Sequence, residues 1–449
     1  MLVHSVEQWL ARGVRKPALV LHTSSVSYGT EILRSLSGLQ LPWLLPDNVY
    51  WELTILSESR CFGAAASYIL AAGQRVCWDL EQLYATSSAG QDRCQLWNGE
   101  MLFLFGDLAK QREFASHMQP LAQGYLLNNT SWLCRRDTGS VCAFSDPGIR
   151  EKVTPVILSP GMWSPAFGQE DFLYVQGSSQ KVSCRDLRKT GKSGNYADLY
   201  TWDAAPGKYL KIYRNCTYSD MYLKKIQLFS RLAGKLPDYP LALPEELLLM
   251  PNGRLAGYTM KTCCGKVMRN YVICGWDGQS LERVIRNLLR LLLELHCMHI
   301  QVNDLSVNNI LVDDNGQVSI VDCDSFQYAD FPGGCMTPIY QHPELLAAEP
   351  YKTLHEPRHE YFSFAVLLFQ CLFYCDPLGL ELEKDTPDKP DWKNSSFRLD
   401  TDADAASCVN RDVWHIWQQQ EPGLRKLFSD VFHFREDISF GAWIRELER

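Results

Sequence analysis

The chain has 449 residues, of which 46% are hydrophobic and 12% aromatic. This length and composition predict about two or three globular domains with packed cores. The formal net charge of −8, without a long basic run, argues against a general nucleic-acid-binding surface.

The cysteines and the first residues indicate the cellular compartment. None of the 16 cysteines forms a CxxC pair, so a zinc site with paired ligands is not expected. Residues 1–13 lack a charged start followed by a long apolar run, which argues against a secretory signal. Reduced thiols in a cytoplasmic protein fit this sequence best.

Residues 1–132 are predicted to form an α/β domain. Strands are expected at 17–23, 48–57 and 101–107, and helices at 30–39 and 63–73. Because strands alternate with helices, the predicted sheet is mainly parallel. Residues 133–175 are rich in Pro and Gly, with short strands such as VTPVIL and FLYVQ, and are interpreted as a connector with some β structure.

The segment LVLHTSSVS, residues 19–27, weakly resembles the first strand and metal loop of von Willebrand A domains. In that family the loop begins with Asp and carries two serines at alternate positions. Here His22 replaces the Asp and Val26 one Ser, which leaves Ser24. A packed His at a strand end is therefore favoured over a metal site. The resemblance implies a scaffold or partner-binding domain without its ion.

A glycine-containing stretch and a strand follow the connector. Residues 191–200 read GKSGNYADLY, and residues 208–213 read KYLKIY. In the second segment Tyr209, Lys211 and Tyr213 alternate with Leu210 and Ile212, which predicts a strand. A helix is expected at 219–232.

A second group of predicted elements surrounds residues 304–328, DLSVNNILVDDNGQVSIVDCDSFQY. An amphipathic helix is expected at 281–296. Two short strands, at 310–312 and 318–321, are joined by an Asp-Asn-Gly turn. The apolar run at 360–375 is shorter than the roughly twenty residues that cross a bilayer, so a core helix is predicted. Residues 377–404 read as a loop-like insertion, and helices are expected at 422–434 and 439–447.

From about residue 176 to 449 the chain resembles the protein-kinase superfamily, on the order of its motifs: a glycine-rich loop, a strand Lys, Asp304, Asn309, Asp322 and the closing segment TPIYQHPE. The segment IVDCDSFQ most resembles the corresponding segment in a bacterial branch of eukaryotic-like Ser/Thr kinases. Members of that branch accompany von Willebrand A domains, and some lie near tellurite-resistance genes. The resemblance implies a bilobal α+β domain, with a small lobe at 176–262 and a large lobe at 263–449.

The same resemblance assigns roles to residues. Asp304 would accept the proton of the acceptor hydroxyl, and Asn309 and Asp322 would hold magnesium. Lys211 would bind the ATP phosphates, and glycines would let backbone N–H groups approach phosphate oxygens closely. The expected nucleotide-binding residues are Gly191, Ser193, Gly194, Leu199, Lys211 and Met260.

The chain also departs from the kinase pattern. The predicted helix at 219–232 contains no Glu, so Lys211 is expected to lack its usual helix partner. Asn303 stands where many kinases carry Arg, and Asp324 stands where the metal-binding motif has Gly. A carboxylate at this position could contact metal, repel it or cap a turn, and a capping or solvated role is favoured.

Two functions follow from these patterns. The first is an ATP- and Mg²⁺-dependent phosphotransferase, with a protein Ser or Thr as the acceptor implied by the family resemblance. The second is a pseudokinase, a binding module that senses nucleotide or presents a scaffold surface without transfer. The retained Asp304, Asn309 and Asp322 favour activity, because positioning and electrostatics supply most of the catalysis in this chemistry.

Overall fold

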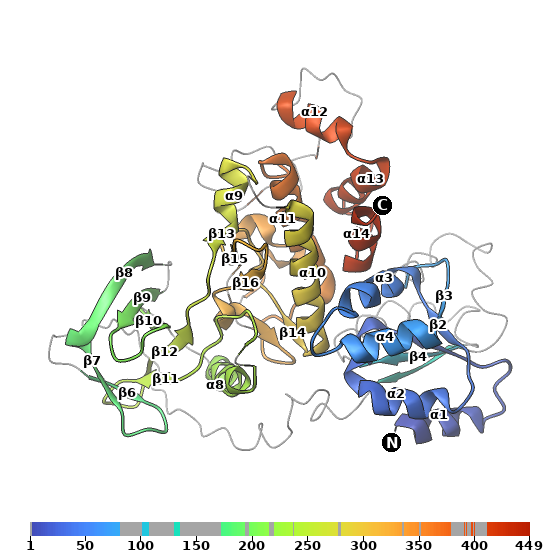
Figure 1. Ribbon diagram of the computed structural model, residues 1–449, viewed down its shortest axis with the longest axis horizontal. Coiled ribbons are helices and arrows are strands. Elements are labelled where there is room, and N and C mark those ends of the chain that lie inside the picture. Colours follow the sequence, from blue (N-terminus) through green and yellow to red (C-terminus); the bar gives the residue numbers. More distant parts are fainter. Residues whose placement is uncertain are drawn as a thin grey trace.

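The computed structural model describes residues 2–80, 101–106, 130–134, 172–193, 197–214, 220–236, 238–276, 280–334, 336–349, 352–378, 390, 392, 397, 399 and 411–449. Gly194, the segment VTPVIL and most of the predicted insertion at 377–404 lie outside these residues. Three parts follow one another across the molecule: an α/β unit at one end, an antiparallel sheet at the other and a helical part between them (Figure 1).

The α/β unit contains a parallel sheet, as predicted. Within the described residues its strand order is β3-β2-β1-β4-β5, and every pair is parallel. The strands are β1 (Ala18–Leu21), β2 (Trp43–Leu45), β3 (Gln74–Arg75), β4 (Met101–Phe105) and β5 (Thr130–Cys134). Among the described residues of this unit, the helices are α1 (Leu2–Leu10), α2 (Gly29–Ser37), α3 (Asp47–Leu56) and α4 (Gly63–Ala72).

The prediction of a strand at 48–57 is wrong, because these residues form helix α3. Val, Tyr, Trp, Thr and Ile favour strands locally, but intrinsic preference yields to tertiary context. Val49, Leu53 and Leu56 share one helix face and are fully buried. Pro46 lies at the N-cap with an extended ψ of 149°. The helix therefore begins directly after Pro46, where a strand was expected from the residue types.

His22 packs where the first strand ends, as the residue pattern favoured. It is buried and its ring lies against Phe105 with centroids 5.2 Å apart. Its Nδ1 accepts the backbone N–H of Ser24 at 3.0 Å, so His22 caps the short 3₁₀ turn Thr23–Tyr28. The neighbouring Ser25 donates its hydroxyl to Leu104 O at 2.9 Å. These side chains therefore stabilise the carboxyl ends of strands β1 and β4, in the middle of the parallel sheet.

The antiparallel sheet has the order β7-β6-β11-β12-β10-β9-β8 among the described residues. Its strands are β6 (Phe172–Val175), β7 (Lys181–Ser183), β8 (Leu187–Ser193), β9 (Ala197–Trp202), β10 (Lys208–Tyr213), β11 (Leu247–Leu249) and β12 (Leu255–Lys261). The segment FLYVQ, interpreted as part of a connector, thus contributes β6 to this sheet. Leu210 and Ile212 face one apolar cluster, while Tyr213 on the opposite face packs with helix α8 (Asp220–Lys235).

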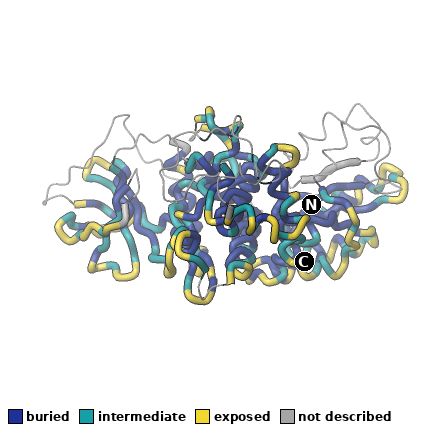
Figure 2. Tube along the Cα trace, turned by 90° about the horizontal axis from the view of Figure 1, so that it is seen from above, coloured by how far each residue is buried: buried dark blue, intermediate teal, exposed yellow. Residues whose placement is uncertain are grey.

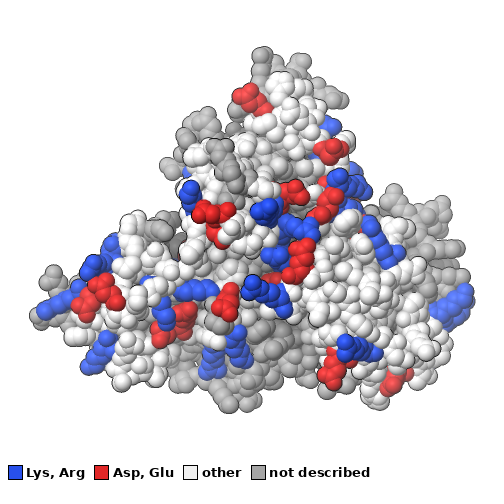
Figure 3. All heavy atoms as spheres, viewed as in Figure 1, with Lys and Arg blue, Asp and Glu red and all other residues white. Residues whose placement is uncertain are grey.

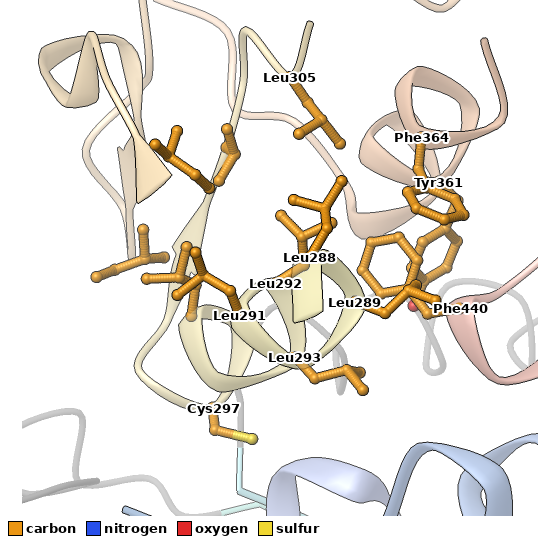
Figure 4. Packing of buried hydrophobic residues seen from close by; sticks show 14 of the residues in the cluster. Leu288, Leu289, Leu291, Leu292, Leu293, Cys297, Leu305, Tyr361, Phe364 and Phe440 are labelled. Carbon is orange, nitrogen blue, oxygen red and sulfur yellow. The ribbon is translucent and has the colours of Figure 1, made fainter. Parts of the chain in front are cut away.

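The helical part is built around two long buried helices, α10 (Leu281–Cys297) and α11 (Pro357–Phe373). Figure 4 shows leucines of α10 close to Tyr361, Phe364 and Phe440, and Figure 2 shows many buried residues in the middle of the molecule. The remaining helices are α9 (Met268–Cys274), α12 (Arg411–Gln419), α13 (Pro422–Phe432) and α14 (Phe440–Leu447). Among the described residues, no helix is long and apolar enough to span a membrane.

Short strands connect these helices. β13 (Lys266–Val267), β15 (Ile310–Val312) and β16 (Val318–Ile320) form an antiparallel sheet, and β14 (Ile300–Gln301) pairs with β17 (Gln327–Tyr328). The predicted turn between β15 and β16 is confirmed, with Gly316 at φ 74°, a conformation that glycine adopts without strain. The loop from β14 to β15 and the end of β16 therefore lie next to each other.

The α/β unit and the helical part share one hydrophobic cluster. Gly441 of α14 donates its backbone N–H to Glu52 Oε1 of α3 at 3.1 Å. A Cβ at Gly441 would lie 2.0 Å from Asn48 O, so only glycine allows this approach. Arg445 Nη1 pairs with Asp47 Oδ2 at 2.9 Å. On the face in Figure 3, acidic and basic side chains are interspersed.

Candidate phosphoryl-transfer site

Asp304 and Asn309 lie in the loop between β14 and β15, and their side chains touch. Asn309 Nδ2 donates to Asp304 Oδ2 at 2.8 Å and to the Asp304 backbone oxygen at 3.0 Å. The backbone N–H of Thr337 donates to Asp304 Oδ1 at 2.7 Å. Both oxygens of Asp304 are thus held by neighbouring groups, which fixes its orientation.

Asp322 follows β16 and faces the same loop. The N–H of Val321 donates to Asn309 O at 2.9 Å, so the backbone joins the two segments. Asp322 adopts φ 57° and ψ 37°, the left-handed region that Asp enters more readily than most residues. Such local strain is concentrated at functional sites. The backbone contact places Asp322 next to the loop that contains Asp304 and Asn309.

Lys211 enters the site from strand β10 of the antiparallel sheet. In the strand register it lies opposite Leu199 of β9 and Tyr258 of β12. Its Nζ lies 3.1 Å from Asp322 Oδ1 and 2.7 Å from Asp324 Oδ1. The residues predicted to bind metal and phosphate are therefore in contact although they come from different sheets.

The expectation that Asp324 caps a turn or is solvated is wrong. Its side chain is buried, and it accepts hydrogen bonds from Lys211 Nζ, from Tyr213 OH at 3.0 Å and from Tyr222 OH at 3.1 Å. Lys211 therefore has a carboxylate partner, and it comes from the segment after Asp322. A buried carboxylate is stable only when it is paired and hydrogen-bonded, which explains this set of donors.

The charges of the site influence one another. Burial acts to lower the pKa of Lys211, but the carboxylates of Asp324 and Asp322 raise it above its ordinary value. Burial acts to raise the pKa of Asp324, and Lys211 with its hydroxyl donors holds it below the usual range. Burial raises the pKa of Asp304 despite the hydrogen bond from Thr337. Lys211 is thus held in its charged form and Asp324 in its ionised form. The nearby Asp304 binds a proton more readily than an ordinary aspartate does.

The other predicted nucleotide-binding residues lie on the antiparallel sheet. Leu199 is half-buried opposite Lys211, and Met260 is buried in β12 opposite Tyr209. Gly191 is exposed in β8, and the backbone of Ser193 pairs with Asp198 of β9. Gly194 lies outside the described residues. A Cβ added at Gly191 would have no heavy atom within 4 Å, so packing does not require glycine there.

Sequence reasoning missed the residues that support Lys211. Gly257 of β12 is one, because a Cβ there would lie 2.0 Å from Lys211 O. Tyr213 and Tyr222 are others, through their hydroxyl bonds to Asp324. Tyr213 gave a signal, since a residue two positions from Lys211 in a strand projects from the same face. Tyr222 gave none that distinguishes it from a core residue.

The donor set fits a hard divalent cation. Magnesium prefers carboxylate and carbonyl oxygens. The side chain of Asp322 is 46% exposed, so it is accessible, and Asn309 uses Nδ2 for Asp304, which leaves its Oδ1 as the remaining amide ligand atom. These two residues would hold the ion, which would neutralise charge on a transferring phosphoryl group.

Another group of side chains, His342, Glu344 and His359, has metal-ligand types within 4.8 Å of one another. Its hydrogen bonds do not fit a cation. Arg358 donates to both carboxylate oxygens of Glu344, at 3.0 and 2.6 Å. His359 Nδ1 accepts from Glu356 N at 3.0 Å, so the neutral ring carries its proton on Nε2 and offers that atom no lone pair. The cluster instead joins the segment around Glu344 to α11.

No protein-family model matches the chain, and no curated protein matches it. Among solved structures, the chain is similar to the ROP18 kinase domain in complex with AMP-PNP and sucrose, with 14% sequence identity and a TM-score of 0.35. That similarity covers 62% of this chain and 87% of the other.

Proposed function

We propose that the chain is an ATP- and Mg²⁺-dependent phosphotransferase of the protein-kinase type, acting on a Ser or Thr hydroxyl of a protein in the cytoplasm. The supporting observation is the contact network that runs from Lys211 through Asp322 to the loop containing Asn309 and Asp304. A strand cation, a metal-binding pair and a carboxylate base are the groups that this reaction requires.

Each residue has a distinct part in the proposed reaction. Lys211 binds the phosphates of ATP, and Asn309 with Asp322 holds the magnesium ion that offsets their charge. Asp304 receives the proton of the acceptor hydroxyl as its oxygen bonds to the γ-phosphorus, while the bond from that phosphorus to the β,γ-bridging oxygen breaks and ADP leaves. Thr337 and Asn309 orient Asp304 through their hydrogen bonds, so the carboxylate is placed before substrate arrives.

Transfer of labelled γ-phosphate by the purified protein, to itself and to a generic basic protein, tests the proposal. Wild-type protein should transfer phosphate in the presence of Mg²⁺, and Lys211→Met and Asp304→Asn should not. Lys208→Met is the matched control, because Lys208 lies on the same strand but pairs with Glu245 and Glu246 at 3.1 and 3.2 Å. Nucleotide binding without transfer by wild-type protein would favour a nucleotide-sensing pseudokinase.

A further inference from the structure

Lys211 has two carboxylate neighbours that differ in their surroundings. The side chain of Asp324 is 9% exposed and that of Asp322 is 46% exposed. The shorter of the two contacts, 2.7 Å, is to Asp324. An ion pair is stronger where water is excluded, so Asp324 contributes more to the position of the ammonium group.

Asp324 is itself held in place from two other elements. Tyr213 of β10 and Tyr222 of α8 both donate hydroxyl hydrogen bonds to its Oδ2, while its Oδ1 accepts from Lys211. The two tyrosine hydroxyls also lie 3.2 Å apart. Both carboxylate oxygens are therefore occupied, and each donor is fixed by a strand or a helix.

Among residues 222–235, the part of helix α8 whose side chains are described, none supplies a carboxylate to Lys211. Between Tyr222 and Lys235 the helix contains no acidic residue, and its link to the ion pair is the Tyr222 hydroxyl. Asp324 lies two residues after Asp322, in the short 3₁₀ turn Cys323–Ser325. The same turn thus positions both the predicted metal ligand and the partner of the predicted phosphate-binding cation.

We propose that Asp324 is the positioning residue that holds Lys211 toward the nucleotide phosphates, in place of a carboxylate from α8. This inference rests on the proposed function. The exposed Asp322 would serve as a ligand for the metal of Mg·ATP, whereas the buried Asp324 would remain the partner of the ammonium group. Lys211 then bridges Asp324 and the phosphates. The position of the Lys211 ammonium group therefore depends on the conformation of the turn Cys323–Ser325, which follows β16.

Calorimetric binding of Mg·ATP and of adenosine to wild-type protein and Asp324→Asn tests the inference. Asparagine keeps the shape of the side chain but removes the charge that orients Lys211. Affinity for Mg·ATP should fall roughly ten- to a hundredfold, the effect of losing a charge-assisted contact, while affinity for adenosine stays unchanged. Asp203→Asn, an exposed carboxylate paired with Arg188, is the charge-matched control and should change neither affinity.

A second variant keeps the test informative if Asp324→Asn does not fold. Tyr213→Phe combined with Tyr222→Phe retains the ion pair but loosens Asp324, and should weaken Mg·ATP binding several-fold without affecting adenosine. Equal losses for Mg·ATP and adenosine would show that Asp324 only maintains the fold, and unchanged Mg·ATP affinity in the folded variants would overturn the inference alone. Wild-type protein that binds no Mg·ATP would instead reject the proposed function and the inference together.

Discussion

Thr337 donates its backbone N–H to Asp304 Oδ1 at 2.7 Å, so the segment that ends at Glu344 is attached to the proposed catalytic base. Burial raises the pKa of Asp304. The proton therefore stays on this carboxylate to a higher pH than on an ordinary aspartate. The hydrogen bond from Thr337 acts to lower the same pKa. The position of the segment 337–344 therefore influences the protonation state of Asp304.

Asp304→Asn should keep Mg·ATP affinity and lower the transfer rate by roughly a hundred- to ten-thousandfold, the usual contribution of general base catalysis. In wild-type protein, transfer requires the ionised carboxylate, so kcat/KM should decline as pH falls through a value above the ordinary aspartate pKa. A pH–rate profile measures this decline. The exposed Asp314→Asn is the control, and full turnover by Asp304→Asn would assign the base to another group.

Asp322→Asn should abolish the Mg²⁺-dependent part of nucleotide binding while leaving the melting temperature of the nucleotide-free protein nearly unchanged. Asparagine is chosen because it tolerates the φ of 57° at this position. Titration of ATP with and without Mg²⁺ measures the effect. If the variant binds Mg·ATP as tightly as wild type, Asp322 does not hold the metal.

Lys225 should make stability depend on pH. It is buried in α8, its Nζ donates to Pro332 O at 2.8 Å, and burial lowers its pKa to about 7 despite the nearby Asp324. Above pH 7 the folded protein releases the proton, whereas the unfolded chain keeps it up to the ordinary lysine value. Stability therefore rises with pH across this window, and the penalty for the buried charge is greatest below it.

Lys225→Met removes that penalty, so it should stabilise the protein at pH 6.5 by an amount on the order of a few kcal/mol, and by much less at pH 9.5. Denaturant unfolding at both pH values measures the difference. The neighbouring Lys224 is exposed, so Lys224→Met should have the same small effect at either pH. A gain from Lys225→Met that does not change with pH would contradict the assignment.

Arg445→Ala should weaken the attachment of the α/β unit to the helical part. Arg445 Nη1 contacts Asp47 Oδ2 at 2.9 Å and Asp79 Oδ1 at 3.1 Å, and its side chain is mostly buried. Without Arg445, Asp47 keeps its ion pair with Arg75 at 2.5 Å and Asp79 still accepts the N–H of Asn48 at 3.0 Å. Both carboxylates nevertheless lose a cationic neighbour, and we expect a destabilisation of about 1–3 kcal/mol. Arg449→Ala, which removes a mostly exposed arginine from its pair with Glu446, should change stability by less than about 0.5 kcal/mol.

Local patterns in the sequence predicted the elements whose contacts are local. The turn that joins β15 and β16, the buried helix α11 and the meeting of Asp304 with Asn309 all follow from residues close together in the chain. The role of Asp324 could not be predicted this way, because its contact with Lys211 spans 113 positions. Helix α3 was missed because its partner α14 lies on a distant segment, and that packing overrides the local preference for a strand.

The contact of α3 with α14 also constrains how the protein forms during synthesis. The hydrogen bond between Asn48 and Ser439 joins residues 391 positions apart, so the part of α3 that α14 covers stays exposed until residue 439 has left the ribosome. Chain segments with exposed apolar surface during translation are prone to aggregate. A shortened polypeptide that ends before residue 439 would therefore expose the apolar surface of α3 that α14 normally covers. Chaperones would bind the α/β unit at this surface.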